Sequence, residues 1–173
     1  MACIIDNGLA LGCSSIGGIE KVYIGTYDGS IVYVLDADMN ITGLAAPTTG
    51  VYNFEQDAEY AGVEQTAEIS RDNGTVYMKT SLSVKFIEMT AELRNTFLSL
   101  AKAPLYAVVK ANSGQFYLLG YNSAGRATEG TLSLGTAQGD MNGGTIKFEW
   151  SGADGIFLLD DGVLGSADLP ILV

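Results

Sequence analysis

Hydrophobic and polar residues alternate in short runs along most of the chain, and turn dipeptides separate the runs. This period of two is typical of antiparallel β-structure. Dipeptides suited to tight turns, Asp28-Gly29, Asn73-Gly74 and Ser113-Gly114, predict three hairpins. These hairpins span residues 20–36, 63–87 and 105–121, and further strands are predicted at 126–134 and 145–150. In the last of these, Ile146, Phe148 and Trp150 share one face.

The first and third hairpins are apolar on both faces. Counting outward from the turns pairs Lys21 with Asp36, Val22 with Leu35, Tyr23 with Val34, Ile24 with Tyr33, Val108 with Leu119 and Val109 with Leu118. A ribbon that is apolar on both faces must be covered on both faces, so one face is expected to meet the core and the other a second subunit. The predicted subunit-interface residues are Tyr23, Ile24, Tyr33, Val34, Val108 and Leu119.

The second hairpin has one apolar and one polar face. Its predicted register places Ile69 opposite Met78, Glu68 opposite Lys79, and Glu64 opposite Ser83. A register error of one residue would exchange the two faces, so the agreement between the strands supports the alternation. Glu64 and Glu68 lie on the polar face.

A single helix is predicted at about residues 91–102. Thr90 is a suitable N-cap, Glu92 lies in the first turn, Lys102 lies in the last turn, and Pro104 ends the element. Leu93, Phe97, Leu100 and Ala101 form an apolar stripe. The predicted fold class is therefore mainly β, an antiparallel β-sandwich or barrel with one flanking α-helix.

The remaining segments are predicted to be loops, and the length of the chain indicates one domain. Residues 39–49, 136–144 and 151–173 are expected to be irregular. A length of 173 residues fits one domain over 1–173, and no internal repeat is evident.

Charge and composition exclude several classes of function. Nine Lys and Arg against twenty Asp and Glu give a net charge of −11, which leaves no basic stripe for tight nucleic-acid binding. The absence of His excludes a Ser-His-Asp or Cys-His hydrolase and any imidazole metal site. Only 17% of the residues are charged although 47% are hydrophobic, a composition that favours a subunit buried by its neighbours.

Local motifs for chemistry are weak. Asp36, Asp38 and Asn40 have the spacing of a calcium loop, but Ile41 and Pro47 occupy its diagnostic Gly and Glu positions, so a polar turn is favoured. Phosphate-binding glycine motifs are missing from the sequence. Cys3 and Cys13 are interpreted as small core residues rather than a disulfide. We therefore expect no catalytic, cofactor-binding or metal-binding residues, no cofactor, and no membrane-spanning segment.

Three segments carry a family resemblance. The first contains Gly8, Leu11, Cys13, Gly17-Gly18 and the predicted strand Val22-Tyr23-Ile24. The second is the centre of the chain, KFIEMTAELRNTFLSLAKAPLYAVVKANSGQFYLLG, and the third is the late turn GTAQGDMNGGTIKFEWSGADG. Together they are similar to phage tail tube proteins. One departure from the family pattern is WSGAD at 150–154, where relatives often show Gly-Glu.

The resemblance implies a tail-tube-like fold in a virion structural protein of a tailed phage or prophage. It implies stacked hexameric rings that form an acidic-lined channel for genome passage, with DNA passing through without tight binding. The implied partners are copies of the chain itself and other tail proteins (tape measure, terminator, baseplate or tip). Segments 1–19 and 151–173 would act as inter-subunit arms, and the protein would be made in the host cytoplasm and reside in the virion tail. Glu64 and Glu68 are candidates for the channel lining. The alternative is that their face, which also carries Lys79 and Lys85, is the outer surface.

Two alternatives remain open at the level of sequence. The chain could be another virion ring protein, such as a tail terminator or a head–tail connector component. It could instead be a virion β-sandwich that binds a glycan or receptor through exposed aromatic residues, with Tyr52, Tyr60, Tyr121 and Trp150 as candidates. An enzyme is not expected.

Overall fold

The computed structural model describes residues 16–44, 50–57, 59–167 and 169–172. It contains twelve strands and one helix in these residues. The elements are β1 (Ile19–Thr26), β2 (Tyr33–Leu35), β3 (Ile41–Leu44), β4 (Val51–Glu55), β5 (Gly62–Ser70), β6 (Thr75–Ile87), α1 (Ala91–Lys102), β7 (Leu105–Ala111), β8 (Phe116–Leu119), β9 (Arg126–Ser133), β10 (Gly143–Gly152), β11 (Phe157–Leu159) and β12 (Ile171–Leu172).

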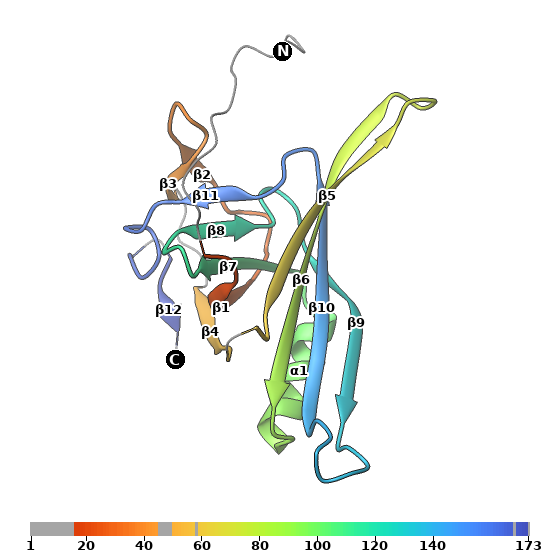
Figure 1. Cartoon of the computed structure of the whole chain (residues 1–173). Helices are drawn as coiled ribbons and strands as arrows, with labels where there is room; N and C mark the ends of the chain where they lie inside the picture. The colour runs from red at the N-terminus through yellow and green to blue at the C-terminus, as the bar shows by residue number, and fades with distance from the viewer. Residues whose placement is uncertain (1–15, 45–49, 58, 168, 173) are drawn as a thin grey trace.

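The strands form two sheets of unequal size (Figure 1). The larger sheet has the order β12-β4-β1-β7-β8-β11-β3-β2, and the smaller one has the order β5-β6-β10-β9. The smaller sheet consists of long antiparallel strands, and the tip of its β5–β6 hairpin extends beyond the rest of the molecule. The fold class predicted from the sequence, a mainly β sandwich with one flanking helix, is confirmed. The expectation of a barrel is corrected, because neither sheet is closed in the described residues.

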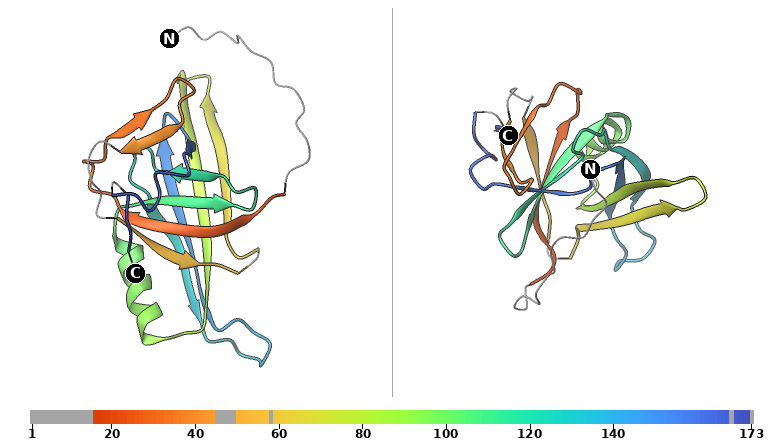
Figure 2. Two further views of the ribbon diagram at one scale, coloured as in Figure 1. Left: turned by 90° about the vertical axis from the view of Figure 1, so that its left-hand side faces the viewer. Right: turned by 90° about the horizontal axis from the view of Figure 1, so that it is seen from above.

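The eight-stranded sheet curls, so that both of its faces are covered within one chain (Figure 2). On one face, Val22, Ile24 and Val109 pack against the four-stranded sheet and α1. On the other face, Tyr23 and Val108 join a second core inside the curl, together with short strands and loops from both ends of the chain. Successive residues of β1 and β7 thus serve two different cores, which explains why these strands are apolar on both faces.

Trp150 anchors the core between the two sheets. Its side chain is 3% exposed, and its indole N–H donates to the Leu105 carbonyl oxygen over 2.9 Å. Gly125 packs so closely against the indole that a Cβ at this position would collide with the ring. The prediction that Ile146, Phe148 and Trp150 share one face is confirmed, and this face is buried in the core.

The helix occurs at the residues that the sequence predicted. The Thr90 hydroxyl accepts a hydrogen bond from the Leu93 backbone N–H over 3.0 Å, as an N-cap does. Phe97 and Leu100 are buried, and the ring of Phe97 lies against the backbone of Gly130 on β9. Ala101 is exposed, so it does not belong to the packed stripe.

The first predicted hairpin does not form. β1 pairs with β4 and β7, so that Val22 lies opposite Phe54 on one side and Val109 on the other. β2 pairs instead with β3 across the turn that begins at Asp36. After β1, Asp28 accepts hydrogen bonds from the backbone N–H and hydroxyl of Ser30 in a local turn that returns no strand to β1. The apolar pattern of β1 fits any apolar partner, and the distant strand β7 provides one.

The third hairpin forms with a register one residue away from the prediction. Val108 lies opposite Leu118, and Val109 lies opposite Tyr117. The loop has three residues rather than two, and Gly114 adopts a positive φ of 89° at its end. Because both faces of this ribbon are apolar, the hydrophobic pattern does not reveal a slip of one residue.

The second hairpin also forms, with a register two residues away from the prediction. Ile69 lies opposite Val76, Glu68 opposite Tyr77, and Glu64 opposite Ser81. The turn contains four residues, 71–74, rather than the two of Asn73-Gly74. A shift of two residues leaves every side chain on its predicted face, so the division into a polar and an apolar face is correct.

The predicted loops are correct in part. Residues 134–142 connect β9 and β10 without regular structure, and Asp140 accepts hydrogen bonds from the N–H groups of Thr136 and Ala137. The polar turn at Asp36 is confirmed, because its carboxylate accepts from the backbone N–H groups of Asp38 and Asn40. The segments 39–49 and 151–173 were expected to be irregular, but they contain β3, β11 and β12. Cys3, Cys13 and most of the predicted arm 1–19 lie outside the described residues.

Candidate assembly surface

One face of the four-stranded sheet is polar over most of its length. The strand register places on this face the side chains that point away from the inter-sheet core. Its charged residues are Glu64, Glu68, Lys79, Lys85, Arg126, Glu129, Lys147 and Glu149. These are four acids and four bases, so the acidic excess of the chain lies outside this face.

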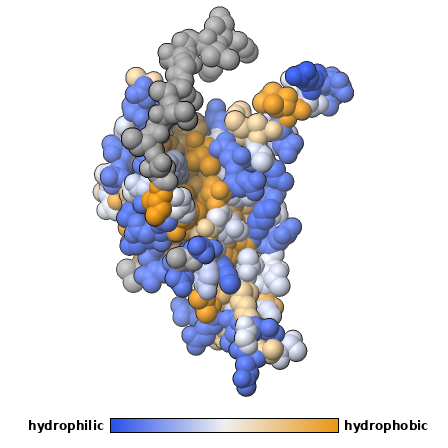
Figure 3. Space-filling model, in the orientation of Figure 1, coloured by the Kyte–Doolittle hydropathy of each residue, from blue (hydrophilic) through white to orange (hydrophobic). Residues whose placement is uncertain are grey.

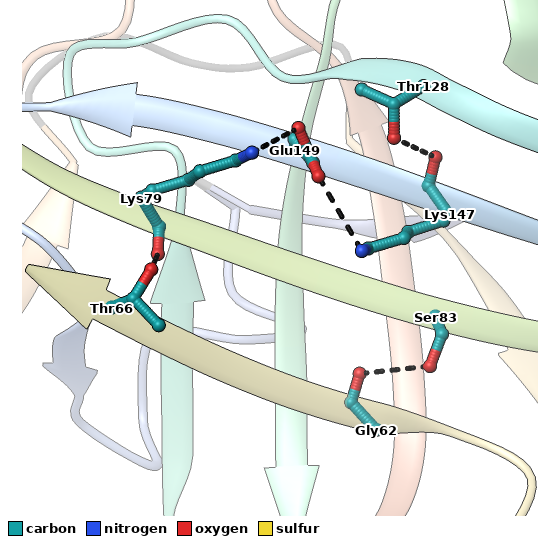
Figure 4. A network of polar contacts seen from close by, with 7 residues as sticks. All are labelled: Gly62, Thr66, Lys79, Ser83, Thr128, Lys147 and Glu149. Carbon is teal, nitrogen blue, oxygen red and sulfur yellow. Dashed lines mark hydrogen bonds and ion pairs between the residues drawn. The ribbon is translucent and has the colours of Figure 1, made fainter. Parts of the chain in front are cut away.

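A polar network crosses the centre of this face (Figure 4). The Glu149 carboxylate contacts Lys79 Nζ at 3.1 Å and Lys147 Nζ at 3.6 Å. The hydrogen bond to Glu149 raises the pKa of Lys79 above its ordinary value, so this ammonium stays charged. Hydroxyl groups of the outer strands bind the backbone of the same lysines: Thr66 on β5 donates to the Lys79 carbonyl, and Thr128 on β9 donates to the Lys147 carbonyl.

Glu64 and Glu68, the predicted channel-lining residues, lie on this polar face. Both side chains are exposed, and they border a shallow hollow of about 150 Å³ that is also lined by Lys79, Lys147 and Glu149. The structure thus brings together Glu64 and Glu68 with an ion-pair network that the sequence analysis missed. The signal for this network was the alternation of residues 145–151, which places Lys147 and Glu149 on the face opposite Phe148.

The projecting end of the β5–β6 hairpin carries apolar side chains that no part of the described chain covers. Ile69 and Val76 face each other across the hairpin, and they are 65% and 64% exposed. They continue the apolar face that Leu82 and Val84 bury inside the molecule. Figure 3 shows apolar residues on this arm, beyond the body of the molecule. Exposed apolar residues in such a position are typical of an interaction surface.

Exposed apolar residues also occur at the opposite end of the four-stranded sheet. Ile87 at the end of β6 is 60% exposed, and Leu134 directly after β9 is 73% exposed. Both strands run toward the end of the molecule that lies farthest from the hairpin tip (Figure 1). The molecule therefore presents apolar side chains at both ends of one long sheet.

Both long edges of the four-stranded sheet are open. β5 and β9 are the outer strands, and no described strand pairs with their outer edges. They contain nine and eight residues. Long unpaired edges are sites where another chain can add a strand.

Four of the six predicted interface residues have almost no surface to offer a neighbour. Tyr23, Ile24, Val108 and Leu119 are 6%, 2%, 0% and 0% exposed. This corrects their assignment to a subunit interface, since the second apolar face that they form is covered by the curl of their own sheet.

The other two predicted interface residues lie together on β2. Val34 is 45% exposed. The Tyr33 ring packs against Tyr121 with a centroid distance of 5.0 Å, and burial raises the pKa of its phenol. Its buried hydroxyl has no hydrogen-bond partner among the described residues. Only Val34 therefore keeps the large exposed area that an interface side chain needs.

The aromatic residues considered for glycan binding are not gathered on one surface. Trp150 is buried, and Tyr121 packs against Phe157 with a centroid distance of 4.2 Å. The Tyr60 ring lies 4.2 Å from Lys85 Nζ, in a cation–π contact. Tyr52 remains 52% exposed.

A groove of about 820 Å³ lies between β5 and the eight-stranded sheet. Its lining is mostly apolar and includes Ile19, Val63, Tyr117 and Leu158, with Gln65 among the few polar side chains. In the described part of the chain, no group of three or more Cys, Asp or Glu side chains is arranged to hold a metal ion. No described helix is long and apolar enough to span a membrane.

Neither the family models, nor the curated proteins, nor the solved structures that were compared with this chain gave a match.

Proposed function

We propose that this chain is a structural subunit of a phage tail tube, which assembles into stacked hexameric rings around a channel for the genome. The observation that carries the proposal is the four-stranded antiparallel sheet with two long open edges. The hexameric ring and the genome as cargo are what the resemblance to tail tube proteins implies, through the sequence around α1 and the turn before β10.

The strand directions suit the closure of such a ring. With four antiparallel strands, the edge strands β5 and β9 run in opposite directions. Copies related by rotation about an axis along the strands would therefore place β9 of one copy antiparallel to β5 of the next. This contact joins two different surfaces, so it repeats around the ring until the rotation closes. Edge pairing would satisfy the backbone groups that both edges leave open.

The apolar ends of the sheet supply a way to stack rings. The hairpin tip with Ile69 and Val76 extends from one end, and Ile87 and Leu134 are exposed at the other. A tip from one ring that contacts the lower end of the next would bury both sets of side chains. Because this contact is also head-to-tail, it would propagate without limit and yield a tube.

In this arrangement the polar face of the sheet forms the channel wall, with Glu64, Glu68 and Glu149 directed toward the axis. The apolar face is already occupied by α1 and the eight-stranded sheet, so it is the face that must lie outward. The resemblance implies an acidic lining, but this face carries four acids and four bases. Such a wall would still hold DNA weakly, because phosphate binding depends on an excess of cations. DNA would then be cargo rather than a bound ligand.

Negative-stain electron microscopy of the purified full-length chain over a concentration series tests the proposal. Rings that extend into tubes as the concentration rises are the expected result. A single closed ring that never extends would favour a tail terminator or a connector component. A monodisperse monomer at high concentration would overturn the proposal.

A further inference from the structure

Glu149 occupies the centre of the polar face, between two lysines. It lies on β10, opposite Ser81 of β6 and opposite Arg126 of β9. One carboxylate oxygen is 3.1 Å from Lys79 Nζ and the other is 3.6 Å from Lys147 Nζ (Figure 4). One acid thus engages two bases that come from adjacent strands.

The exposure of the three side chains indicates which of them solvent reaches. The Glu149 side chain is 20% exposed, whereas those of Lys79 and Lys147 are 40% and 39% exposed. The carboxylate therefore lies deeper, with the ammonium groups above and beside it. Without the carboxylate, the two lysines would present a pair of accessible positive charges at the middle of the sheet.

A pair of accessible lysines on a strand surface is a potential phosphate site. DNA binds to such sites mainly because each phosphate that a cation neutralises releases condensed counterions. A carboxylate already in contact with the cation competes with phosphate for it, and it does so from within the same molecule at a fixed distance.

From this geometry we propose that Glu149 is an internal counterion that prevents Lys79 and Lys147 from holding DNA phosphates. The inference rests on the proposed function, since it assigns Glu149 the task of letting a polyanion pass the channel wall without being retained. The contact with Lys79 would still link β6 to β10, and Glu149 would remove the affinity of both lysines for the cargo.

The test compares Glu149→Gln with Glu64→Gln in binding to a DNA duplex. Glu64→Gln is the matched control, because it removes the same charge from the same face and the same hollow but leaves both lysine contacts with Glu149 in place. Full-length protein is used below its assembly concentration, so that the polar face is accessible. Fluorescence anisotropy of a labelled duplex is recorded from about 50 to 200 mM salt, the range over which phosphate contacts weaken strongly.

The expected result is that Glu149→Gln gains DNA binding over the control. Its log association constant should fall with log salt by a slope about 1.8 steeper than that of Glu64→Gln, since each of two phosphates contributes about 0.9. Adding Lys79→Gln and Lys147→Gln to Glu149→Gln should abolish the gain. Equal binding by the two single variants would overturn the inference, as would tight binding by the unaltered chain.

Folding is checked by circular dichroism before binding is measured. If Glu149→Gln does not fold, Glu149→Thr makes the same charge change with a residue that favours strands. Failure of the inference is distinguishable from failure of the proposed function, because the binding assay uses unassembled protein. Tubes in the microscope with no gain in DNA binding would refute the counterion alone, whereas a gain in binding without rings would refute the tube.

Discussion

Replacing Ile69 by Asp tests whether the projecting hairpin is an assembly contact. In the single chain this side chain is 65% exposed, and it lies opposite Val76, which is 64% exposed. Such a site makes few contacts within the subunit, so the free energy of unfolding should change by no more than about 0.5 kcal/mol. The backbone of β5 would remain paired with that of β6.

The effect on assembly should be much larger. Burying a whole Ile side chain contributes about 1.5–3 kcal/mol, so covering the exposed two-thirds of Ile69 contributes about 1–2 kcal/mol. Losing this contribution weakens each contact between subunits roughly 5- to 25-fold, because about 1.4 kcal/mol corresponds to a factor of ten in affinity. The cost of burying a carboxylate adds to this loss. The concentration at which assembly begins should therefore rise at least 5-fold, by this estimate from buried area.

Light scattering against protein concentration measures this threshold, and denaturant unfolding measures the stability of the subunit. Thr75→Asp is the matched control, because it adds the same charge near the tip of the same hairpin but on the polar face. The control should assemble close to the unaltered threshold. If Ile69→Asp assembles at the same concentration as Thr75→Asp, the hairpin is not an assembly contact.

Three further predictions concern the subunit itself. Trp150→Ala should lower the free energy of unfolding in denaturant by about 3–5 kcal/mol, because it empties the centre of the inter-sheet core and removes the hydrogen bond to Leu105; a loss under 1 kcal/mol would contradict the assigned packing. Thr90→Ala should cost about 1 kcal/mol in the same assay through loss of the helix N-cap, whereas Thr90→Ser should restore most of it. Backbone hydrogen bonds from Ala137 and Thr136 hold the pKa of Asp140 below its ordinary value of 3.8. The ionised carboxylate therefore contributes fully to stability above pH 3.8, and this contribution is lost as the pH falls through the lowered pKa. Asp140→Asn should flatten the pH dependence of thermal unfolding in this acidic range, and an unchanged profile would refute the contribution.

The helix and the two faces of the β5–β6 hairpin were predictable because their signals are local. Thr90 and Glu92 mark the start of α1 and Pro104 follows its end, so each signal lies within two residues of the helix end that it marks. The polar and apolar residues of β5 and β6 alternate regularly. The wrong turn shifted the predicted register by two residues, and this shift left each side chain on its correct face.

The pairing of β1 was not predictable because its partners lie far away in the chain. β7 begins almost eighty residues after the end of β1, and an apolar strand carries no mark that selects one apolar partner over another. The same uniformity concealed the slip of one residue between β7 and β8, which the three-residue loop before Gln115 sets.

The predicted interface failed at Tyr23, Ile24, Val108 and Leu119 for a related reason. The sequence showed that two apolar faces needed cover, but it did not show that the eight-stranded sheet curls and supplies the second cover itself. Two of the apolar residues that remain exposed, Ile69 and Val76, belong to a hairpin whose two faces the sequence predicted correctly.

A cryo-electron microscopy reconstruction of the particles formed by the full-length chain tests the assembly most directly. It should show β9 of each copy running antiparallel beside β5 of the next, with Glu64 and Glu149 directed toward the axis of a hollow ring. A reconstruction in which these two edges lie apart, or in which Glu149 points to the outside, would contradict the proposed tube.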